Sequence, residues 1–282
     1  MLLILPTLLA LWGVAACSAP AFVRENDQAA ERFLAGHPGA EGFAGLTHYV
    51  RGGTAGKPKI IFVHGSPGSW KAFATYLGDP ELGARAELIS VDRPGYGLTQ
   101  PGQPERSLWG QVKGLEPLLD LGDPRQPAIL VGHSYGGAVI VRWAMGERRP
   151  DPRIRQLLVL AGAVDPGLEK KKWFQYPADW FWVRWLLPSD LDVCNQEIEA
   201  LKTELEAMAP HWGEIRSEID VIQGLDDDMV PPANAEYIEA HASKLHPRIQ
   251  RIPGLNHFIP WKRADLVRAA LLQALDRLGS SP

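Results

Sequence analysis

The sequence contains little cysteine and no recognisable metal-binding pattern. Its 282 residues include only two cysteines, Cys17 and Cys194, which are too few for a disulfide framework. Neither CxxC nor HExxH occurs, and these spacings are the usual signatures of zinc sites. The phosphate-binding patterns GxxxxGK[ST] and GxGxxG are also absent. We therefore expect neither a metal ion nor a cofactor.

An excess of positive charge is also missing. The chain has 29 Lys and Arg against 33 Asp and Glu, which gives a formal net charge of −4 at pH 7. A nucleic-acid-binding protein usually shows a basic excess, so we expect no nucleic-acid partner. Hydrophobic residues make up 45% and charged residues 22%. This composition is typical of a globular protein that buries a large core and needs no disulfide bonds or structural metal ions.

Charged side chains are absent from the first 23 residues, and the first one is Arg24. The apolar run at 2–16 is typical of a secretory signal. It ends in Val-Ala-Ala-Cys at Cys17, which resembles a bacterial lipobox, although no Lys or Arg precedes the run. The resemblance implies a lipid on Cys17, a membrane partner, and export to the periplasm or the cell exterior. An ordinary signal peptide cut near Ala16 or Ala19, a retained anchor and a mis-assigned start remain alternatives.

Strand and helix patterns alternate from residue 46 onward. Continuous apolar runs such as KIIFV at 59–63 are typical of strands that are buried on both faces. The alternation predicts a mostly parallel sheet with helices on both faces. Strands are expected within 46–53, 59–65, 86–95, 155–166, 218–224 and 248–254, helices within 26–36, 107–122, 231–243 and 259–279, and a strand–turn–helix within 128–147.

The strand–turn–helix carries a G-x-S-x-G motif, Gly132-His133-Ser134-Tyr135-Gly136. A serine on a tight strand-to-helix turn exposes its hydroxyl, and small neighbours prevent a clash there. The N-terminus of the helix also directs partial positive charge at the reacting centre. We therefore predict that Ser134 is a nucleophile.

Together with two other turns, this motif resembles the α/β-hydrolase superfamily. The segment His64-Gly65-Ser66-Pro67-Gly68 resembles the HGxPG turn of that superfamily. The resemblance implies that the backbone N–H groups of Ser66 and Tyr135 form the oxyanion hole. The segment 92–97, DRPGYG, resembles the turn after the following strand, and we interpret it as structural.

The acid and the base follow from the same resemblance. The segment VIQGLDDDMVP at 221–231 resembles a strand followed by GxxDxxVP, which selects Asp227 rather than Asp226 or Asp228. His257 follows the last predicted strand, where the superfamily places its histidine. The order Ser134, Asp227, His257 is the one expected for this fold. Asp165, which follows another strand, is the competing acid.

Residues 165–216 interrupt the alternation where the superfamily inserts a helical cap. Within it, helices are expected at 177–188 and 195–208, and the run 170–172 of three lysines is interpreted as a solvated face. The resemblance divides the chain into a signal peptide (1–16), a linker and lead-in (17–45), an α/β-hydrolase core (46–164 and 217–282) and the cap. The cap holds five tryptophans: Trp173, Trp180, Trp182, Trp185 and Trp212.

The predicted activity is hydrolysis of a carboxylic ester through an acyl-enzyme on Ser134. The substrate is expected to be a small or medium-sized molecule with an apolar part that fits under the cap. A C–C bond hydrolase, a thioesterase, an amidase or peptidase and a perhydrolase would keep the same residues. Haloalkane dehalogenases and epoxide hydrolases are disfavoured, because those relatives have Asp where Ser134 stands. A non-catalytic, membrane-tethered binding protein is the alternative from a different class.

Overall fold

A computed structural model describes residues 21–169 and 188–280. Its centre is an eight-stranded sheet in the order β1-β2-β4-β3-β5-β6-β7-β8. The strands β1 and β2 run antiparallel to their neighbours, whereas β4, β3, β5, β6, β7 and β8 pair in parallel. The strands are β1 (Glu41–Ala44), β2 (Thr47–Gly53), β3 (Lys59–Val63), β4 (Glu87–Val91), β5 (Ala128–His133), β6 (Ile154–Leu160), β7 (Glu218–Gly224) and β8 (Arg248–Ile252).

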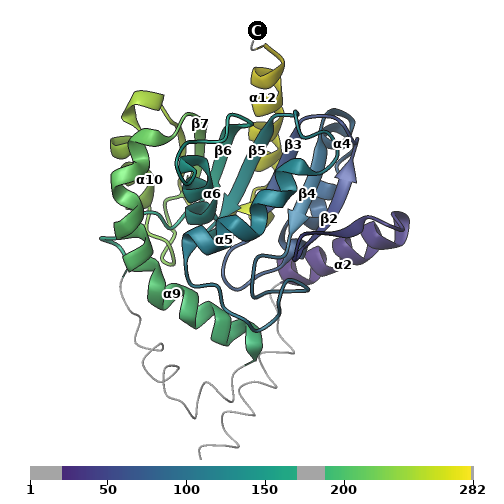
Figure 1. Cartoon of the computed structure of the whole chain (residues 1–282), viewed down its shortest axis with the longest axis horizontal. Coiled ribbons are helices and arrows are strands. Elements are labelled where there is room, and N and C mark those ends of the chain that lie inside the picture. The colour runs from purple at the N-terminus through teal and green to yellow at the C-terminus, as the bar shows by residue number, and fades with distance from the viewer. Residues whose placement is uncertain (1–20, 170–187, 281–282) are drawn as a thin grey trace, which may run out of the picture.

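Helices cover both faces of the sheet, as the alternation of strands and helices predicts (Figure 1). On one face lie α5 (Leu108–Leu115), α6 (Tyr135–Met145) and α10 (Ala233–His241), and on the other lie α2 (Ala21–Gly36), α4 (Pro80–Arg85) and α12 (Ala264–Ser280). Short helices α3 (Ala74–Leu77) and α11 (Ile259–Lys262) accompany the second group, and the long helix α9 (Ser189–Met208) lies across the carboxyl ends of the parallel strands (Figure 1).

Successive residues of strand β3 pack into the two hydrophobic cores, one on each face of the sheet. In β3, Ile61 and Val63 pack into the core beneath α5 and α6, whereas Ile60 and Phe62 pack against the opposite core. All four side chains are fully buried. This is why the strand reads as a continuous apolar run rather than an alternating one.

The segment expected as a linker and lead-in contains two elements. Helix α2 begins at Ala21, five residues earlier than the predicted stretch, and buries Asn26, Ala30 and Phe33 on one face. Strand β1 buries only Ala44 among its four residues, so its sequence carries too little apolar pattern to indicate a strand. Cys17 lies outside the described residues. None of the helices within 21–169 and 188–280 is long and apolar enough to cross a bilayer.

Two predicted helices are divided. The helix expected at 107–122 ends at Leu115 and continues as a 3₁₀ turn through Pro117, because proline has no N–H for the α-helical pattern. The last helix is divided into α11 and α12 at Arg263, whose φ of −134° and ψ of 49° are not helical. In the cap, α9 begins six residues before the predicted start at Asn195. The predicted helix 177–188, the lysine run and the other four cap tryptophans lie outside the described residues, while Trp212 is buried.

The turn after β5 is packed directly against the turn after β3. A Cβ atom on Gly136 would lie 2.3 Å from the carbonyl oxygen of Val63 and 2.6 Å from that of His64. These are backbone atoms that cannot rotate away, so the helix α6 approaches β3 only because residue 136 has no side chain.

Replacing Gly136 with Ala should therefore lower the free energy of unfolding by more than about 2 kcal/mol, because overpacking forces the backbone to shift. Gly213→Ala is the matched control, since nothing lies within 4 Å of its Cβ position. Urea unfolding of both variants measures the difference. Equal midpoints for the two variants would contradict this packing argument.

Candidate active site

Ser134 lies at the sharp turn between β5 and α6 with φ 56° and ψ −124°. A positive φ is strained for a residue with a Cβ atom. The turn is held by its backbone, because the N–H of Ser134 donates to the carbonyl of Leu160 at 3.0 Å and its carbonyl accepts from Gly137 at 2.8 Å. The strained turn leaves the side chain of Ser134 partly exposed beside a cavity.

His257 and Asp227 form a buried pair in the loops that follow β8 and β7. The Nδ1 atom of His257 lies 2.8 Å from Oδ2 of Asp227, and both residues are 4% exposed. The other oxygen, Oδ1, accepts from the backbone N–H groups of Met229 and Val230 at 2.9 and 2.8 Å. Because both oxygens of Asp227 have partners, its carboxylate is fixed in orientation. A carboxylate only accepts hydrogen bonds, so Nδ1 of His257 carries the proton and Nε2 is available as a base.

The competing carboxylates have other surroundings. Asp226 and Asp228 are exposed. Asp165 accepts from the N–H of Gly167 at 2.7 Å and so caps its own turn. The geometry therefore pairs His257 with Asp227 and not with Asp165.

The two histidines within the motifs, His64 and His133, form hydrogen bonds with backbone groups. The Nε2 atom of His133 donates to the carbonyl oxygen of His257 at 3.0 Å. His64 donates from Nδ1 to the carbonyl of Gly65 at 2.7 Å and accepts at Nε2 from the N–H of Arg93 at 3.0 Å. Burial lowers the pKa of each histidine to about 3. Both are therefore neutral and serve as hydrogen-bonding groups near neutral pH.

A cavity of about 310 Å³ joins these residues to helix α9. Ser134, His257, Ser66 and Tyr135 contribute to its wall, so the structure brings together four of the residues that the sequence predicts for the site. Helix α9 contributes Leu191, Cys194, Ile198 and Leu201, and the loops add Met229, Val230 and Ala163. Burial raises the pKa of the Cys194 thiol, which therefore remains a neutral lining group. No Lys or Arg side chain is found among the described residues of this wall.

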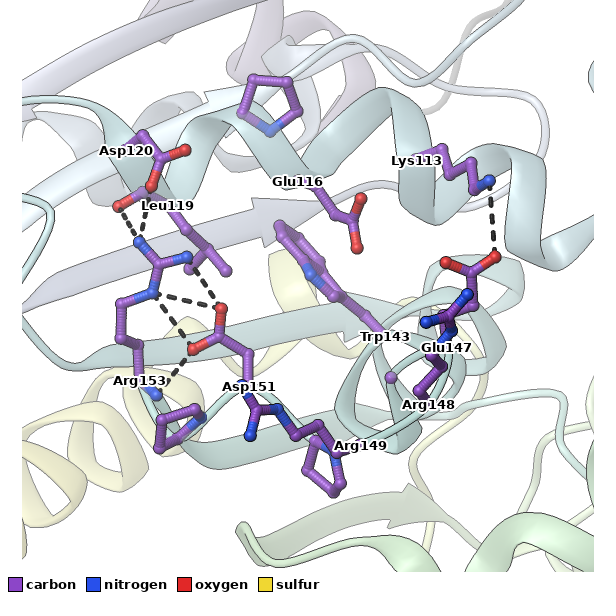
Figure 2. A pocket seen from close by; sticks show the side chains of 14 residues that line it. Lys113, Glu116, Leu119, Asp120, Trp143, Glu147, Arg148, Arg149, Asp151 and Arg153 are labelled. Carbon is purple, nitrogen blue, oxygen red and sulfur yellow. Dashed lines mark hydrogen bonds and ion pairs between the residues drawn. The ribbon is translucent and has the colours of Figure 1, made fainter.

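A larger groove of about 580 Å³ lies at the opposite end of the sheet (Figure 2). It is formed where α6 ends and where the chain leads into β6. Ion pairs join Lys113 to Glu147 at 3.6 Å and Arg153 to Asp151 and Asp120 at 2.7 and 2.6 Å (Figure 2). Among the described residues, this groove contains no serine, cysteine or histidine. We therefore place the candidate site at the smaller cavity, where a hydroxyl and an imidazole are present.

A buried ion pair connects α9 to the turn after β3. The guanidinium of Arg93 donates to both carboxylate oxygens of Glu197, at 2.7 and 3.0 Å, and both side chains are fully buried. The remaining donors of Arg93 reach the carbonyls of His64 and Gly65 at 2.9 and 3.0 Å. Burial opposes the charge of Arg93, but Glu197 outweighs it and raises the pKa of the guanidinium.

Glu197 accepts three further hydrogen bonds. Ser66 Oγ donates at 2.6 Å, the Tyr96 hydroxyl at 2.8 Å and the Gln111 amide at 2.7 Å. Arg93 also lies over the ring of Tyr135, 4.6 Å from its centroid. The Glu197 carboxylate on α9 therefore accepts a hydrogen bond from the side chain of Ser66, while its partner Arg93 contacts the backbone beside Ser66 and the ring of Tyr135.

The sequence motifs do not indicate this role for Glu197. Its helix contains four glutamates, at 197, 199, 204 and 206, and no motif distinguishes the one that is buried. Arg93 was expected only to shape the turn. A signal was present in the burial pattern, because Glu197 shares a helix face with Leu201 and Leu205 at a spacing of four residues.

The residues 60–270 match the sequence profile described as "Alpha/beta hydrolase family". Among curated proteins, epoxide hydrolase 1 of Caenorhabditis elegans is 27% identical over 143 residues, which are 48% of this chain and 33% of that protein. The 2-hydroxy-6-oxo-2,4-heptadienoate hydrolase of Pseudomonas putida is 35% identical over 120 residues, 41% of this chain and 40% of that protein. The matches thus span less than half the length of these relatives.

Solved structures show the same fold over most of the chain. A serine hydrolase from the bacterium Cycloclasticus zankles superposes with a TM-score of 0.64 at 18% identity, covering 86% of this chain and 98% of that one. A lipase-esterase related protein from Clostridium acetobutylicum gives a TM-score of 0.62 at 20% identity, with 81% and 99% coverage. At such low identity, these similarities concern the fold.

Replacing Glu197 with Gln should lower the free energy of unfolding by about 3 kcal/mol, because it leaves the guanidinium of Arg93 buried without a counter-charge. Urea unfolding at pH 7 measures the change.

Glu199→Gln is the matched control on the same helix. Its carboxylate pairs with Arg106 at the surface, at 2.8 Å, and is 44% exposed, so the expected loss is below about 1 kcal/mol. Similar losses for the two variants would show that burial does not increase the contribution of the Arg93–Glu197 pair to the free energy of unfolding.

Proposed function

We propose that this chain, which belongs to the Alpha/beta hydrolase family, hydrolyses carboxylic esters through a covalent acyl-enzyme on Ser134. The observation that carries the proposal is the 2.8 Å bond between His257 and the buried Asp227, beside the cavity that Ser134 and His257 both line. A serine hydroxyl needs such a base to become a nucleophile near neutral pH. Asp227 has the role of fixing the imidazole tautomer and stabilising its protonated form.

The reaction has two steps in this proposal. Ser134 Oγ attacks the ester carbonyl while Nε2 of His257 takes its proton, and the protonated imidazole then donates that proton to the leaving alkoxide. A water molecule, deprotonated by His257, attacks the acyl-enzyme and releases the carboxylic acid and free Ser134. In both steps the carbonyl oxygen becomes negative, and we assign its stabilisation to the backbone N–H groups of Ser66 and Tyr135.

The cavity favours an uncharged, apolar acyl or alkyl group. Its described walls combine Leu191, Ile198 and Leu201 of α9 with Met229 and Val230. A volume of about 310 Å³ is at the small end of the range for ligand pockets. Thioesters and amides would use the same residues, so the preference for esters is tested by comparing a panel of matched substrates.

Hydrolysis of a C–C bond is a second candidate. It is favoured by the similarity of 120 residues to 2-hydroxy-6-oxo-2,4-heptadienoate hydrolase. The name of that enzyme describes a carboxylate substrate, whereas the described cavity wall offers no Lys or Arg to bind one. Epoxide opening fits Ser134 poorly, because attack by serine would give an ether that water does not hydrolyse.

Ser134→Ala should abolish labelling by a fluorophosphonate probe and lower kcat for p-nitrophenyl butyrate by at least about 10³-fold, because it removes the hydroxyl on which the acyl-enzyme forms. Asp227→Asn should lower kcat by about 10³–10⁴-fold, because it favours the wrong tautomer of His257. The measurements are gel fluorescence of the probe and steady-state kinetics.

Asp226→Asn is the control for Asp227→Asn, since Asp226 is its exposed neighbour, and its kcat should stay within twofold of the wild type. Labelling that persists in Ser134→Ala would exclude Ser134 as the nucleophile. A wild type that neither labels nor hydrolyses any ester of the panel would leave the tethered binding protein as the better hypothesis.

We propose in addition that Cys17 is lipidated and tethers the exported protein to a membrane. The support is the Val-Ala-Ala-Cys sequence that ends an uncharged apolar run. Radiolabelled palmitate should be incorporated into the wild type and into Cys194→Ser, but not into Cys17→Ser. Absence of label from the wild type would contradict the proposal.

A further inference from the structure

The exposed large apolar side chains of the described residues gather at one end of the molecule. Six such residues are between 37% and 69% exposed. Single exposed apolar side chains are common anywhere on a protein surface. A concentration of them at one end therefore marks a candidate interaction surface. They are Val23, Phe43, Leu46, Leu98, Leu225 and Met229, and we call them the apolar rim.

Three members of the apolar rim follow the carboxyl ends of parallel strands. Leu225 comes directly after β7, and Met229, four residues later, also contributes to the cavity wall. The N–H of Leu98 donates at 3.0 Å to the side chain of Asp92, which directly follows β4. These side chains therefore lie at the end of the sheet that carries Ser134.

Phe43 lies in β1, where it pairs with His48 near the start of β2, and Leu46 lies in the turn that joins the two strands. Because β2 runs antiparallel to β4 and Tyr49 pairs with Val91, the start of β2 lies level with the end of β4. The turn is consequently at the same end of the sheet as Leu98. The hydrogen bond from the N–H of His48 to the side chain of Thr99, at 2.8 Å, joins the two segments directly.

The first turn of α2 also reaches this end. The ring of Phe22 lies 4.8 Å from that of Phe258 and 5.3 Å from that of Trp261, and Phe258 directly follows His257. The described chain therefore begins beside the candidate active site. The residues that precede it contain no charged side chain, and Cys17 is four residues from Ala21, a span of at most about 14 Å.

We infer that the apolar rim rests on a lipid surface and that the site takes its ester from that surface. The occupant is a lipid bilayer, because the uncharged N-terminal run leads into the described structure at the same end as the rim. Exposed charges of both signs flank the rim, with Asp226 and Asp228 beside Met229 and Arg24 beside Val23, so these residues give no excess of positive charge that would select anionic lipids. The surface is therefore neutral or zwitterionic, and the substrate class is an acyl ester of such a lipid.

The lipid contact is tested first without reference to activity. In a Cys194→Ser background, Leu98→Cys is labelled with an environment-sensitive fluorophore and mixed with phosphatidylcholine vesicles. The emission should shift to the blue and rise at least about twofold, because the label enters an apolar medium. Arg148→Cys, an exposed position in the groove at the opposite end, is the matched control and should not shift, while the parent Cys194→Ser protein gives the baseline for Cys17, its one native cysteine.

Delivery of the substrate is tested by kinetics and depends on the proposed function. The triple variant Phe43→Ser, Leu46→Ser, Leu98→Ser should hydrolyse diacylglycerol in phosphatidylcholine vesicles about tenfold more slowly than the wild type. Its rate on soluble p-nitrophenyl butyrate should stay within twofold, because none of the three residues contributes to the cavity wall. The pair Arg148→Ser, Arg149→Ser should leave both rates unchanged.

The two arms separate failure of this inference from failure of the proposed function. Equal emission from the labels at 98 and 148 would overturn the lipid contact, and so would a triple variant that keeps the full rate on vesicles. Emission that shifts only with phosphatidylglycerol vesicles would overturn the assignment to a neutral or zwitterionic surface. A blue shift at 98 in a protein that hydrolyses no ester would support the lipid contact and contradict the proposed esterase.

Discussion

The buried ion pair of Arg93 and Glu197 is the interaction on which the arrangement of the site depends. Neither charge has any access to solvent, and burial of a charge is costly unless it is paired and hydrogen-bonded. The cost is offset only when helix α9, the turn after β3 and the turn after β4 are all in place, because each contributes partners. The pair therefore favours one relative placement of these three segments over all others.

That placement connects the apolar wall of the cavity to the proposed oxyanion hole. Helix α9 contributes the apolar wall of the cavity through Leu191, Ile198 and Leu201, and from the same helix Glu197 holds the side chain of Ser66. A shift of α9 would thus move the proposed oxyanion donor together with the apolar wall of the cavity. The pair of Asp227 and His257 lies on the loops after β7 and β8, and the hydrogen bonds of these two side chains join them to each other and to Met229 and Val230 rather than to Glu197. The proposed base and the proposed oxyanion hole are therefore supported separately.

The two ends of the sheet differ in the kind of side chains that they expose. The carboxyl ends carry the cavity and the apolar rim, while the groove at the opposite end is lined by ion pairs among Lys113, Glu147, Asp151 and Arg153 (Figure 2). Loops at the carboxyl ends are free to vary because the strands beneath them supply the stability. Exposed apolar side chains are therefore tolerated there and are available for a lipid surface.

The sequence by itself determined the sheet, the order of its strands and helices, and the motifs around Ser134, Ser66, Asp227 and His257, because each depends on local apolar runs or on turn residues at short spacing. It did not indicate β1, whose four residues bury one side chain, or the break between α11 and α12. Only the tertiary structure decided which of four glutamates on α9 is buried, and that Asp227 rather than Asp165 faces His257. The contacts that decide these two points join residues that are 30 to 131 positions apart, so no local pattern encodes them. The fold likewise brings the members of the apolar rim, which lie between residues 23 and 229 of the chain, to one end of the molecule.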